Sequence, residues 1–380
     1  MLLKKLFFTL ILIFVFSFSV YSVDEPQISA NSAILINAES KEIIYEKNAY
    51  VQRSMASTTK IMTSILAIES GKLSDVVTAE NINSEGTSIG LKDGYKLTLE
   101  ALVWGMMLES GNDAAKLTAD YLSGSEENFA LLMNKKADEI GMTQSNFVTA
   151  SGLDDKEHYS TAYDMALLGA YTVKNPLFRE ICSAKSKRVS FIEPAITSTF
   201  SNHNRLLSSC EGVFGIKTGF TKKSGRCLVT ACERDGTVLV CVTLNAGDDW
   251  NDHIKLYKYG YEACESRDVF IRIPESLNVY GGYESAVNLC LAEVPVRISL
   301  KDNDCKITQK ICLPEFVYAP IKIGDVLGKA QILNHGKVIY ESDILSSEDV
   351  LEIEHLTENK SIFDRFFSKI IEIFDQPKGL

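Results

Sequence analysis

The sequence has no excess of basic residues. Its 39 Lys and Arg are outnumbered by 50 Asp and Glu, and the formal net charge is −11. Proteins that bind nucleic acid present a basic face, so we expect no nucleic-acid partner. Internal repeats and low-complexity tracts are absent, and hydrophobic residues (46%) and charged residues (23%) occur in ordinary globular proportions. A chain of 380 residues with this composition can form two domains.

The cysteines form no metal-binding pattern. Nine are present, without a CxxC pair or a regular disulfide spacing, and no cysteine–histidine cluster has the spacing of metal ligands. We therefore expect no metal and no other cofactor. Cys227, Cys232 and Cys241 lie in apolar, strand-like segments, where cysteine acts as a small core residue. Buried free thiols are the main expectation, and disulfide pairing in an exported chain is the alternative.

The apolar run at the N-terminus is short for a membrane-spanning helix, which needs about 20 residues. Lys4 and Lys5 precede the apolar segment 6–16, and Val20-Tyr21-Ser22 has the pattern of a small-residue cleavage site. We expect residues 1–22 to be a secretory signal peptide cleaved after Ser22. This predicts an exported protein, with an uncleaved anchor as the alternative.

Strand and helix patterns alternate from residue 29 to about residue 265. Segment 32–49 predicts two strands around a polar turn, and segment 58–71 predicts a helix. Segment 97–124 predicts two helices broken at Ser110-Gly111, with Thr98 as the cap of the first. Segment 225–247 predicts a hairpin that turns at Asp235-Gly236. Helices combined with an antiparallel sheet indicate a layered α/β or α+β enzyme domain.

The pattern changes near residue 268. Short alternating segments predict a separate β-rich domain over residues 268–356. In the tail, apolar residues recur at helical spacing and predict an amphipathic helix over residues 358–376. We expect this helix to lie on a membrane surface; docking on its own domain and a dimer contact are the alternatives.

Three short motifs follow one another in the first domain. Ser57-x-x-Lys60 is the only S-x-x-K of the chain, and the only K-T-G is at 217–219. Between them lies the triplet at 110–112, an S-x-N pattern that recurs elsewhere. Taken singly, an S-x-x-K motif is usually a helix cap with a surface lysine, an S-G-N triplet is usually a helix break, and a K-T-G motif is usually a turn. Their order is that of penicillin-recognising serine enzymes, which favours a joint catalytic role.

The spacing of these residues suits nucleophilic catalysis. Residues three apart share one face of a helix, so a neutral Lys60 amine can reach the Ser57 hydroxyl and accept its proton. Burial and a second ammonium, expected to be that of Lys217, lower the pKa of Lys60. Backbone N–H groups at a helix start favour an oxyanion formed on attack by Ser57. Ser110 can relay a proton, Asn112 can hold a substrate amide, and the K-T-G strand can pair with a peptide and bind its terminal carboxylate.

The chain resembles the low-molecular-weight penicillin-binding proteins, which are serine-type D-alanyl-D-alanine carboxypeptidases of peptidase family S11. The resemblance covers roughly residues 28–265 and is carried by blocks at 54–69, 86–115, 146–169, 202–207 and 212–231. It implies a five-stranded antiparallel sheet flanked by helices, with a helical subdomain that carries Ser110. The β-rich region and the amphipathic tail fit, less specifically, the family's stalk domain and membrane-surface anchor.

The resemblance also implies roles for individual residues. The catalytic group is Ser57, Lys60 and Ser110, and the substrate-binding group is Asn112, Lys217, Thr218, Gly219 and Phe220. Ser57 would be the acylated nucleophile and Lys60 its general base. The backbone N–H groups of Ser57 and Phe220 would form the oxyanion hole, although position 220 is His in some members.

The implied reaction removes the terminal D-alanine from peptidoglycan stem pentapeptides through an acyl-serine intermediate. Peptidoglycan stem peptides that end in D-Ala-D-Ala would be the substrates, and β-lactams would be covalent inhibitors. The expected location is the extracytoplasmic face of the cytoplasmic membrane or the cell wall.

Three alternatives stay open from the sequence. A β-lactamase would need a glutamate that positions water, for which Glu157 is a candidate, and a DD-endopeptidase would share the site. A catalytically silent, membrane-attached wall-binding protein is the third. His158 with Asp154-Asp155 could suggest a Ser-His-Asp triad, but we expect His158 to have a structural role in its loop, and Arg205 to be a positioning or structural residue.

Overall fold

The computed structural model describes residues 24–83, 85–292, 296–300 and 306–353. The chain divides into two compact units, residues 1–267 with 299–303 and residues 268–298 with 304–380. We describe each unit by itself. The expected signal peptide (1–22) and amphipathic helix (358–376) lie outside the described residues, and the domain limits 28–265 and 268–356 stay predictions.

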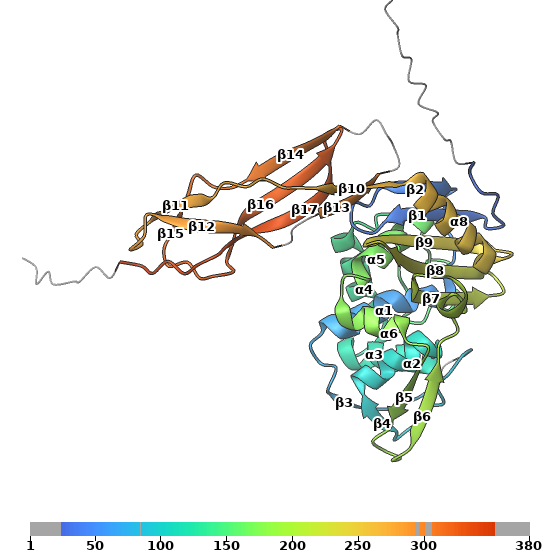
Figure 1. Cartoon of the computed structure of the whole chain (residues 1–380). Helices are drawn as coiled ribbons and strands as arrows, with labels where there is room; N and C mark the ends of the chain where they lie inside the picture. The colour runs from blue at the N-terminus through green and yellow to red at the C-terminus, as the bar shows by residue number, and fades with distance from the viewer. Residues whose placement is uncertain (1–23, 84, 293–295, 301–305, 354–380) are drawn as a thin grey trace, which may run out of the picture. The chain divides into compact units, whose positions relative to one another are not determined.

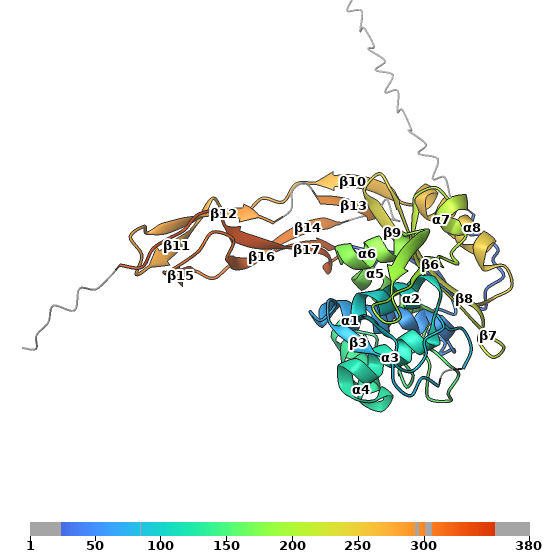
Figure 2. The ribbon, with the colours of Figure 1, turned by 90° about the horizontal axis from the view of Figure 1, so that it is seen from below.

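The first unit combines one large sheet with a group of helices (Figures 1 and 2). Its strands are β1 (Ser32–Asn37), β2 (Ile43–Lys47), β3 (Val76–Thr78), β4 (Lys96–Thr98), β5 (Ser186–Ser190), β6 (Thr197–Ser201), β7 (Val213–Thr221), β8 (Gly225–Arg234) and β9 (Thr237–Ala246). Its helices are the 3-10 helix η1 (Ala56–Thr59), α1 (Lys60–Glu69), α2 (Leu99–Leu108), α3 (Asn112–Ser123), α4 (Glu126–Ile140), α5 (Ala162–Thr172), α6 (Pro176–Ser183), α7 (Leu206–Ser209) and α8 (Asp249–Ala263).

The large sheet has five strands in the order β2-β1-β9-β8-β7, and all neighbours are antiparallel. Side chains of β1 alternate between two cores: Ile34 and Ile36 face the helical group that includes α5, whereas Leu35 packs on the side of α8. Helices therefore cover both faces of the sheet. The five-stranded antiparallel sheet flanked by helices and the hairpin of β8 and β9 are confirmed.

The N-terminal end of β1 is tied to α8. The Asp252 carboxylate accepts hydrogen bonds from the backbone N–H of Ser29 (2.8 Å), the hydroxyl of Ser29 (2.7 Å) and the backbone N–H of Ala30 (2.9 Å). Asp252 is buried, and 223 positions separate it from Ser29. This contact joins the beginning of the first unit to its last helix.

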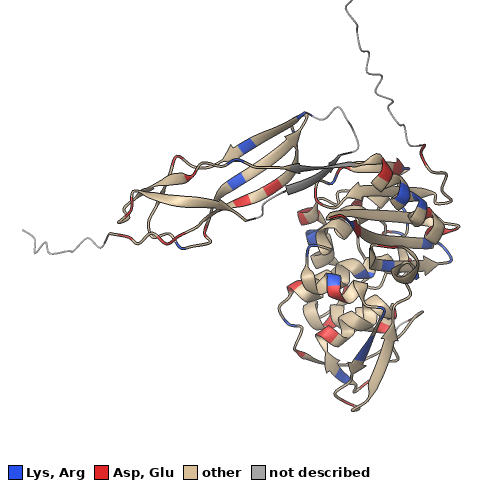
Figure 3. Ribbon diagram, in the orientation of Figure 1, with Lys and Arg blue, Asp and Glu red and all other residues tan. Residues whose placement is uncertain are grey.

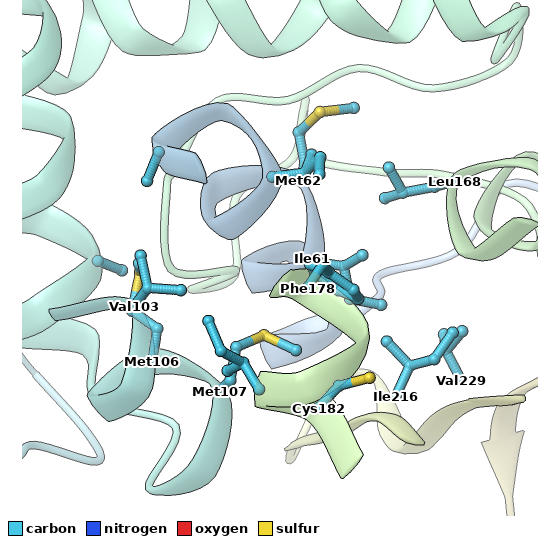
Figure 4. Close-up of a cluster of buried hydrophobic side chains, with 14 of the residues drawn as sticks. Ile61, Met62, Val103, Met106, Met107, Leu168, Phe178, Cys182, Ile216 and Val229 are labelled. Carbon is cyan, nitrogen blue, oxygen red and sulfur yellow. The ribbon is translucent and has the colours of Figure 1, made fainter. Parts of the chain in front are cut away.

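The helices form a continuous apolar core beside the sheet. Figure 4 shows side chains of α1, α2, α5 and α6 packed against residues of the sheet. Ile61, Met107 and Phe178 belong to the helices, and Ile216 belongs to β7. The predicted break between α2 and α3 is confirmed at residues 109–111, and Thr98 caps α2 by accepting a hydrogen bond from the Ala101 N–H (3.2 Å). The core fixes α1, α3 and the sheet relative to one another.

The second unit is all β among its described residues. A six-stranded sheet has the order β14-β16-β17-β12-β11-β15, and β10 pairs with β13 in a separate two-stranded sheet. The strands are β10 (Glu265–Val269), β11 (Ser276–Tyr280), β12 (Ala286–Leu291), β13 (Val296–Leu300), β14 (Ile307–Cys312), β15 (Phe316–Tyr318), β16 (Val326–Asn334) and β17 (Lys337–Ser346). The predicted β-rich domain is confirmed. Acidic and basic residues occur in both units (Figure 3).

Candidate active site

The S-x-x-K motif spans the junction of η1 and α1 and brings its two functional residues into contact. Lys60 is the first residue of α1, and Ser57 lies in η1. Lys60 Nζ donates a hydrogen bond of 3.0 Å to Ser57 Oγ. Lys60 is fully buried, whereas Ser57 is half-buried and lines a cavity. A ligand in the cavity can therefore reach Ser57, while Lys60 contacts Ser57 from the protein interior.

Two more oxygen atoms fix the position of the Lys60 amine. Nζ also donates to Asn112 Oδ1 and to the backbone carbonyl of Ser151, both at 2.7 Å. The orientation of the Asn112 amide is fixed because its Nδ2 donates to the Glu85 carbonyl (2.6 Å). A neutral amine has two hydrogens and one lone pair. When Asn112 and Ser151 receive the two hydrogens, the lone pair faces the Ser57 hydroxyl, as general-base catalysis requires.

Burial lowers the pKa of Lys60 well below the value of an ordinary lysine. Desolvation is the main cause; the ammonium of Lys217 adds repulsion, and the Asp113 carboxylate opposes the shift. Lys217 is only 2% exposed, and desolvation lowers its pKa to about 7. Its Nζ donates to the backbone carbonyl of Thr218 (3.0 Å). The neutral form of Lys60 is therefore much more accessible than in a solvated lysine.

The K-T-G strand runs directly beside the nucleophile. β7 is an edge strand of the large sheet and packs against η1. A Cβ on Gly219 would lie 3.0 Å from Thr58 N and 3.1 Å from both Ser57 N and Met55 O. Glycine thus permits the close approach of this strand to the backbone of η1. An edge strand beside Ser57 can pair with an extended peptide, and the next residue, Phe220, is 66% exposed.

A glycine allows a second loop to pack behind the nucleophile. Gly152 has φ +84°, and a Cβ at this position would lie 1.9 Å from the carbonyl oxygen of Ala56. Only glycine can approach so closely with this backbone conformation. Because Ser151 precedes Gly152, this packing also brings the Ser151 carbonyl to Lys60.

His158 holds the same loop in place. Its Nδ1 accepts hydrogen bonds from the backbone N–H groups of Val148 (3.0 Å) and Thr149 (3.2 Å), so its Nε2 carries the hydrogen that is donated to Thr59 Oγ1 (2.9 Å). Burial lowers the pKa of His158 to about 4, which keeps the ring neutral. These contacts are structural. They give no support to a Ser-His-Asp triad, because the ring bonds to Thr59.

The cavity in front of the nucleophile has a volume of about 350 Å³. It is lined by Ser57, Thr87, Ser110, His203, Arg205, Thr218, Gly219, Phe220, Arg226, Asp249 and Trp250. Ser110 reaches it from the link between α2 and α3, where its φ is +62°. Five of the eight residues predicted for the site line this cavity, and the other three, Lys60, Asn112 and Lys217, are buried. In the described part of the chain, no three His, Cys, Asp or Glu side chains gather as metal ligands would.

The sequence did not indicate several residues of the site. The Ser151 group that contacts Lys60 is a backbone carbonyl, which no side-chain pattern reveals. Arg226, Asp249 and Trp250 line the cavity from β8 and α8. A single signal could have pointed to Arg226, since it is a charged residue just before the apolar run 227–232 of its strand.

Comparisons with known proteins agree with this geometry. Residues 19–248 match the family model of peptidase S11, described as D-alanyl-D-alanine carboxypeptidase. The chain belongs to this family. Residues 254–352 match a second model, the C-terminal domain of penicillin-binding protein 5. The carboxypeptidase family is one of serine enzymes that act through an acyl-serine, so the chain is a serine-type D-alanyl-D-alanine carboxypeptidase and a penicillin-binding protein.

Individual relatives extend over most of the chain. The carboxypeptidase is 31% identical to D-alanyl-D-alanine carboxypeptidase DacF of Bacillus subtilis, covering 86% of this chain and 87% of that one. It is 34% identical to DacC of Escherichia coli, with 87% and 86% covered. Penicillin-binding protein 5 from Haemophilus influenzae matches its fold with a TM-score of 0.64 at 27% identity, over 87% of this chain and all of that one.

Proposed function

We propose that Ser57 is the nucleophile of the carboxypeptidase and that Lys60 is its general base. Ser57 Oγ attacks the carbonyl carbon of the penultimate D-alanine, and the hydroxyl proton passes to Lys60 Nζ. The carbon–nitrogen bond then breaks, the proton moves to the amine of the departing D-alanine, and an ester on Ser57 is left. Water attacks this ester in the second half-reaction, Lys60 takes the proton from water, and Ser57 regains it as the ester bond breaks.

The observation that carries this proposal is the set of three acceptors around the Lys60 amine. Asn112 and Ser151 occupy two donor directions, and the third points at Ser57 Oγ. Burial and the neighbouring Lys217 both favour loss of the proton from Lys60. An ordinary solvated lysine beside a serine would have neither property.

The other predicted residues take supporting roles. Ser110 relays the proton toward the leaving amine. Asn112 holds a substrate amide, in addition to its hydrogen bond with Lys60. The backbone N–H groups of Ser57 and Phe220 form the oxyanion hole, which Gly219 allows by its close approach to η1. Peptidoglycan stem peptides ending in D-Ala-D-Ala are the substrates. β-Lactams acylate Ser57, because their strained amide mimics the bond between the two D-alanines.

Labelling with fluorescent penicillin tests these roles. The wild-type enzyme is expected to form an adduct one ligand heavier by intact mass, and Ser57→Ala to form none. Lys60→Met, in which no base contacts the serine, is expected to lose labelling while the thermal transition remains cooperative. An adduct on Ser57→Ala at the wild-type rate would contradict the assignment. Release of free D-alanine from a diacetyl-Lys-D-Ala-D-Ala peptide, compared with nitrocefin turnover, separates carboxypeptidase from β-lactamase activity.

We further propose that the enzyme works outside the cytoplasm, attached to the outer surface of the cytoplasmic membrane. The relatives named above support an extracytoplasmic location, and the sequence patterns of residues 1–22 and 358–376 suggest export and surface attachment. No helix of the described residues is long and apolar enough to cross a bilayer. Flotation with liposomes of the chain 23–380 and of the chain 23–356 tests this: only the longer chain is expected to float, and equal flotation of both would refute attachment through the tail.

A further inference from the structure

One end of the second unit exposes a group of large apolar side chains. We call this end the aromatic tip and define it by three neighbouring segments, residues 280–284, 315–323 and 350–353. The large apolar side chains exposed there include Tyr280, Tyr283, Phe316, Tyr318, Leu351 and Ile353. Figure 1 shows β11 and β15 side by side at this end of the unit. Soluble proteins rarely expose a contiguous apolar surface unless it binds something.

The strand pairing explains why the aromatic rings of the tip are exposed together. β11 and β15 are parallel neighbours that pair Val279 with Val317 and Tyr280 with Tyr318, and both valines pack in the small apolar core of the unit. Because side chains alternate along a strand, Tyr280, Phe316 and Tyr318 face away from that core. The centre of the Phe316 ring lies 4.9 Å from that of Tyr280 and 5.4 Å from that of Tyr318, in edge-to-face contacts. The three rings form one exposed group, in which Tyr318 is 70% exposed.

The described part of the chain ends at this tip. Glu352 pairs with Gly282, and the backbone N–H of Ile353 donates to the carbonyl of Gly281 (2.8 Å). Segment 358–376, which the sequence predicts to be an amphipathic helix on a membrane surface, begins five residues after Ile353. An extended chain spans at most about 3.6 Å per residue, so this segment starts within about 18 Å of the tip. A tail that lies on a bilayer therefore holds the tip close to the same bilayer.

The chemistry of the tip suits the layer where a bilayer meets water. Tyrosine combines an apolar ring with a polar hydroxyl and is enriched at this depth. The charged residues of the three segments are Glu284, Glu315, Glu352 and Lys322. With three acids and one base, the tip is not attracted to anionic lipid by its charge. Insertion of its rings between zwitterionic headgroups is the favourable contact that remains.

We propose that the aromatic tip is a second membrane contact, in which Tyr280, Phe316 and Tyr318 insert into the headgroup layer beside the tail. The inference rests on the proposed attachment of the enzyme through residues 358–376, because the tail brings the tip to the surface. Attachment through the tail alone would leave the second unit free to turn. Two contacts restrict its orientation relative to the bilayer.

A tryptophan placed in the tip tests the insertion directly. The chain 23–380 is mixed with vesicles of phosphatidylcholine, with and without bromine on the acyl chains, because bromine quenches tryptophan at short range. Tyr318→Trp is the probe, and the wild type with its two tryptophans gives the background. Phe270→Trp is the matched control, because Phe270 is 71% exposed in the same unit. Two residues later, the Arg272 N–H donates to Gln309 of β14, at the opposite edge of the sheet from β15.

We expect the added emission of Tyr318→Trp to shift to shorter wavelength on the vesicles and to be quenched by bromine, and that of Phe270→Trp to do neither. The double variant Tyr280→Ser/Tyr318→Ser should lower the vesicle partition coefficient by about 10- to 100-fold, because two half-inserted rings contribute about as much as one fully buried aromatic side chain. Phe270→Ser should keep the wild-type coefficient. All variants should release D-alanine from the soluble peptide at the wild-type rate, which shows that they are folded.

Two results would refute the second contact: bound Tyr318→Trp that bromine does not quench, and a double variant that partitions like the wild type. A wild-type dimer in solution that the double variant does not form, seen together with unquenched Tyr318→Trp, would assign the rings to a contact between copies. Failure of the tail attachment looks different, because the wild-type chain would then not bind the vesicles at all.

Discussion

Replacing Gly152 by alanine tests whether the loop behind the nucleophile must approach η1 so closely. The added Cβ would lie 1.9 Å from the carbonyl oxygen of Ala56, about 1.5 Å closer than the 3.4 Å at which ordinary contact begins. Because the obstacle is backbone, either the loop or η1 has to move. Ser151, which immediately precedes Gly152, would then be displaced from the Lys60 amine that it contacts at 2.7 Å.

The expected loss of stability has two parts. An alanine held at positive φ costs roughly 1–2 kcal/mol, and a buried donor that loses its acceptor costs roughly 1–3 kcal/mol. Together they predict a fall of roughly 2–5 kcal/mol in the free energy of unfolding. Acylation of the folded variant should slow by about 100-fold, as expected for a displacement of about 1 Å in the catalytic geometry. Urea unfolding and the second-order rate constant with fluorescent penicillin measure the two effects.

Gly141→Ala is the matched control for this experiment. Gly141 ends α4 with φ +91°, and nothing lies within 4 Å of a Cβ at that position. It should therefore show only the backbone cost of roughly 1–2 kcal/mol and acylate at the wild-type rate. If the two variants lose equal stability and both acylate normally, the close approach of Gly152 has no role in holding Lys60.

Three further predictions concern the pH dependence and the packing of the same unit. The acylation rate should rise with pH as Lys60 loses its proton. Lys217→Met should move the midpoint of this rise to higher pH, because the ammonium that repels the Lys60 proton is gone. A midpoint at lower pH would show that Lys217 does not lower the pKa of Lys60. Gly219→Ala should slow acylation at least about tenfold, measured in the same assay, because its Cβ meets the backbone of η1 at 3.0–3.1 Å; a wild-type rate would show that the strand has room. Burial lowers the pKa of His253 to about 3, so the unfolded state binds more protons below pH 6.5. The free energy of unfolding should accordingly fall by roughly 3–5 kcal/mol between pH 6.5 and 3, and urea titrations should give a flatter profile for His253→Asn.

Local patterns predicted much of the fold. The apolar spacing of 58–71, the Thr98 cap and the Asp235-Gly236 turn each depend on neighbours in the sequence, and the structure has α1, the cap of α2 and the β8–β9 hairpin there. The contact of Ser57 with Lys60 also follows from a spacing of three residues. Such features can be read from sequence because the groups involved are close along the chain.

Other features of the site arise from contacts between distant segments. The Ser151 carbonyl reaches Lys60 across 91 positions, and Asp249 holds Arg226 across 23. A backbone oxygen has no residue type to identify it, and burial decides which of several cations faces the cavity. The sequence likewise did not reveal that the Lys217 ammonium is buried and donates to the Thr218 carbonyl, and the role of Lys217 in binding the substrate stays a prediction.

The strand order has a consequence for how the catalytic unit is made. β1, near the start of the unit, is an inner strand that needs β9 as its neighbour, and its entry is fastened to Asp252 more than 200 positions later. Neither the central pairing nor this fastening exists until nearly the whole unit has been synthesised. Such long-range pairing slows folding. A chain threaded outward through a membrane as it lengthens would therefore stay unfolded until its last helix has followed, and the nucleophile would be assembled only on the far side.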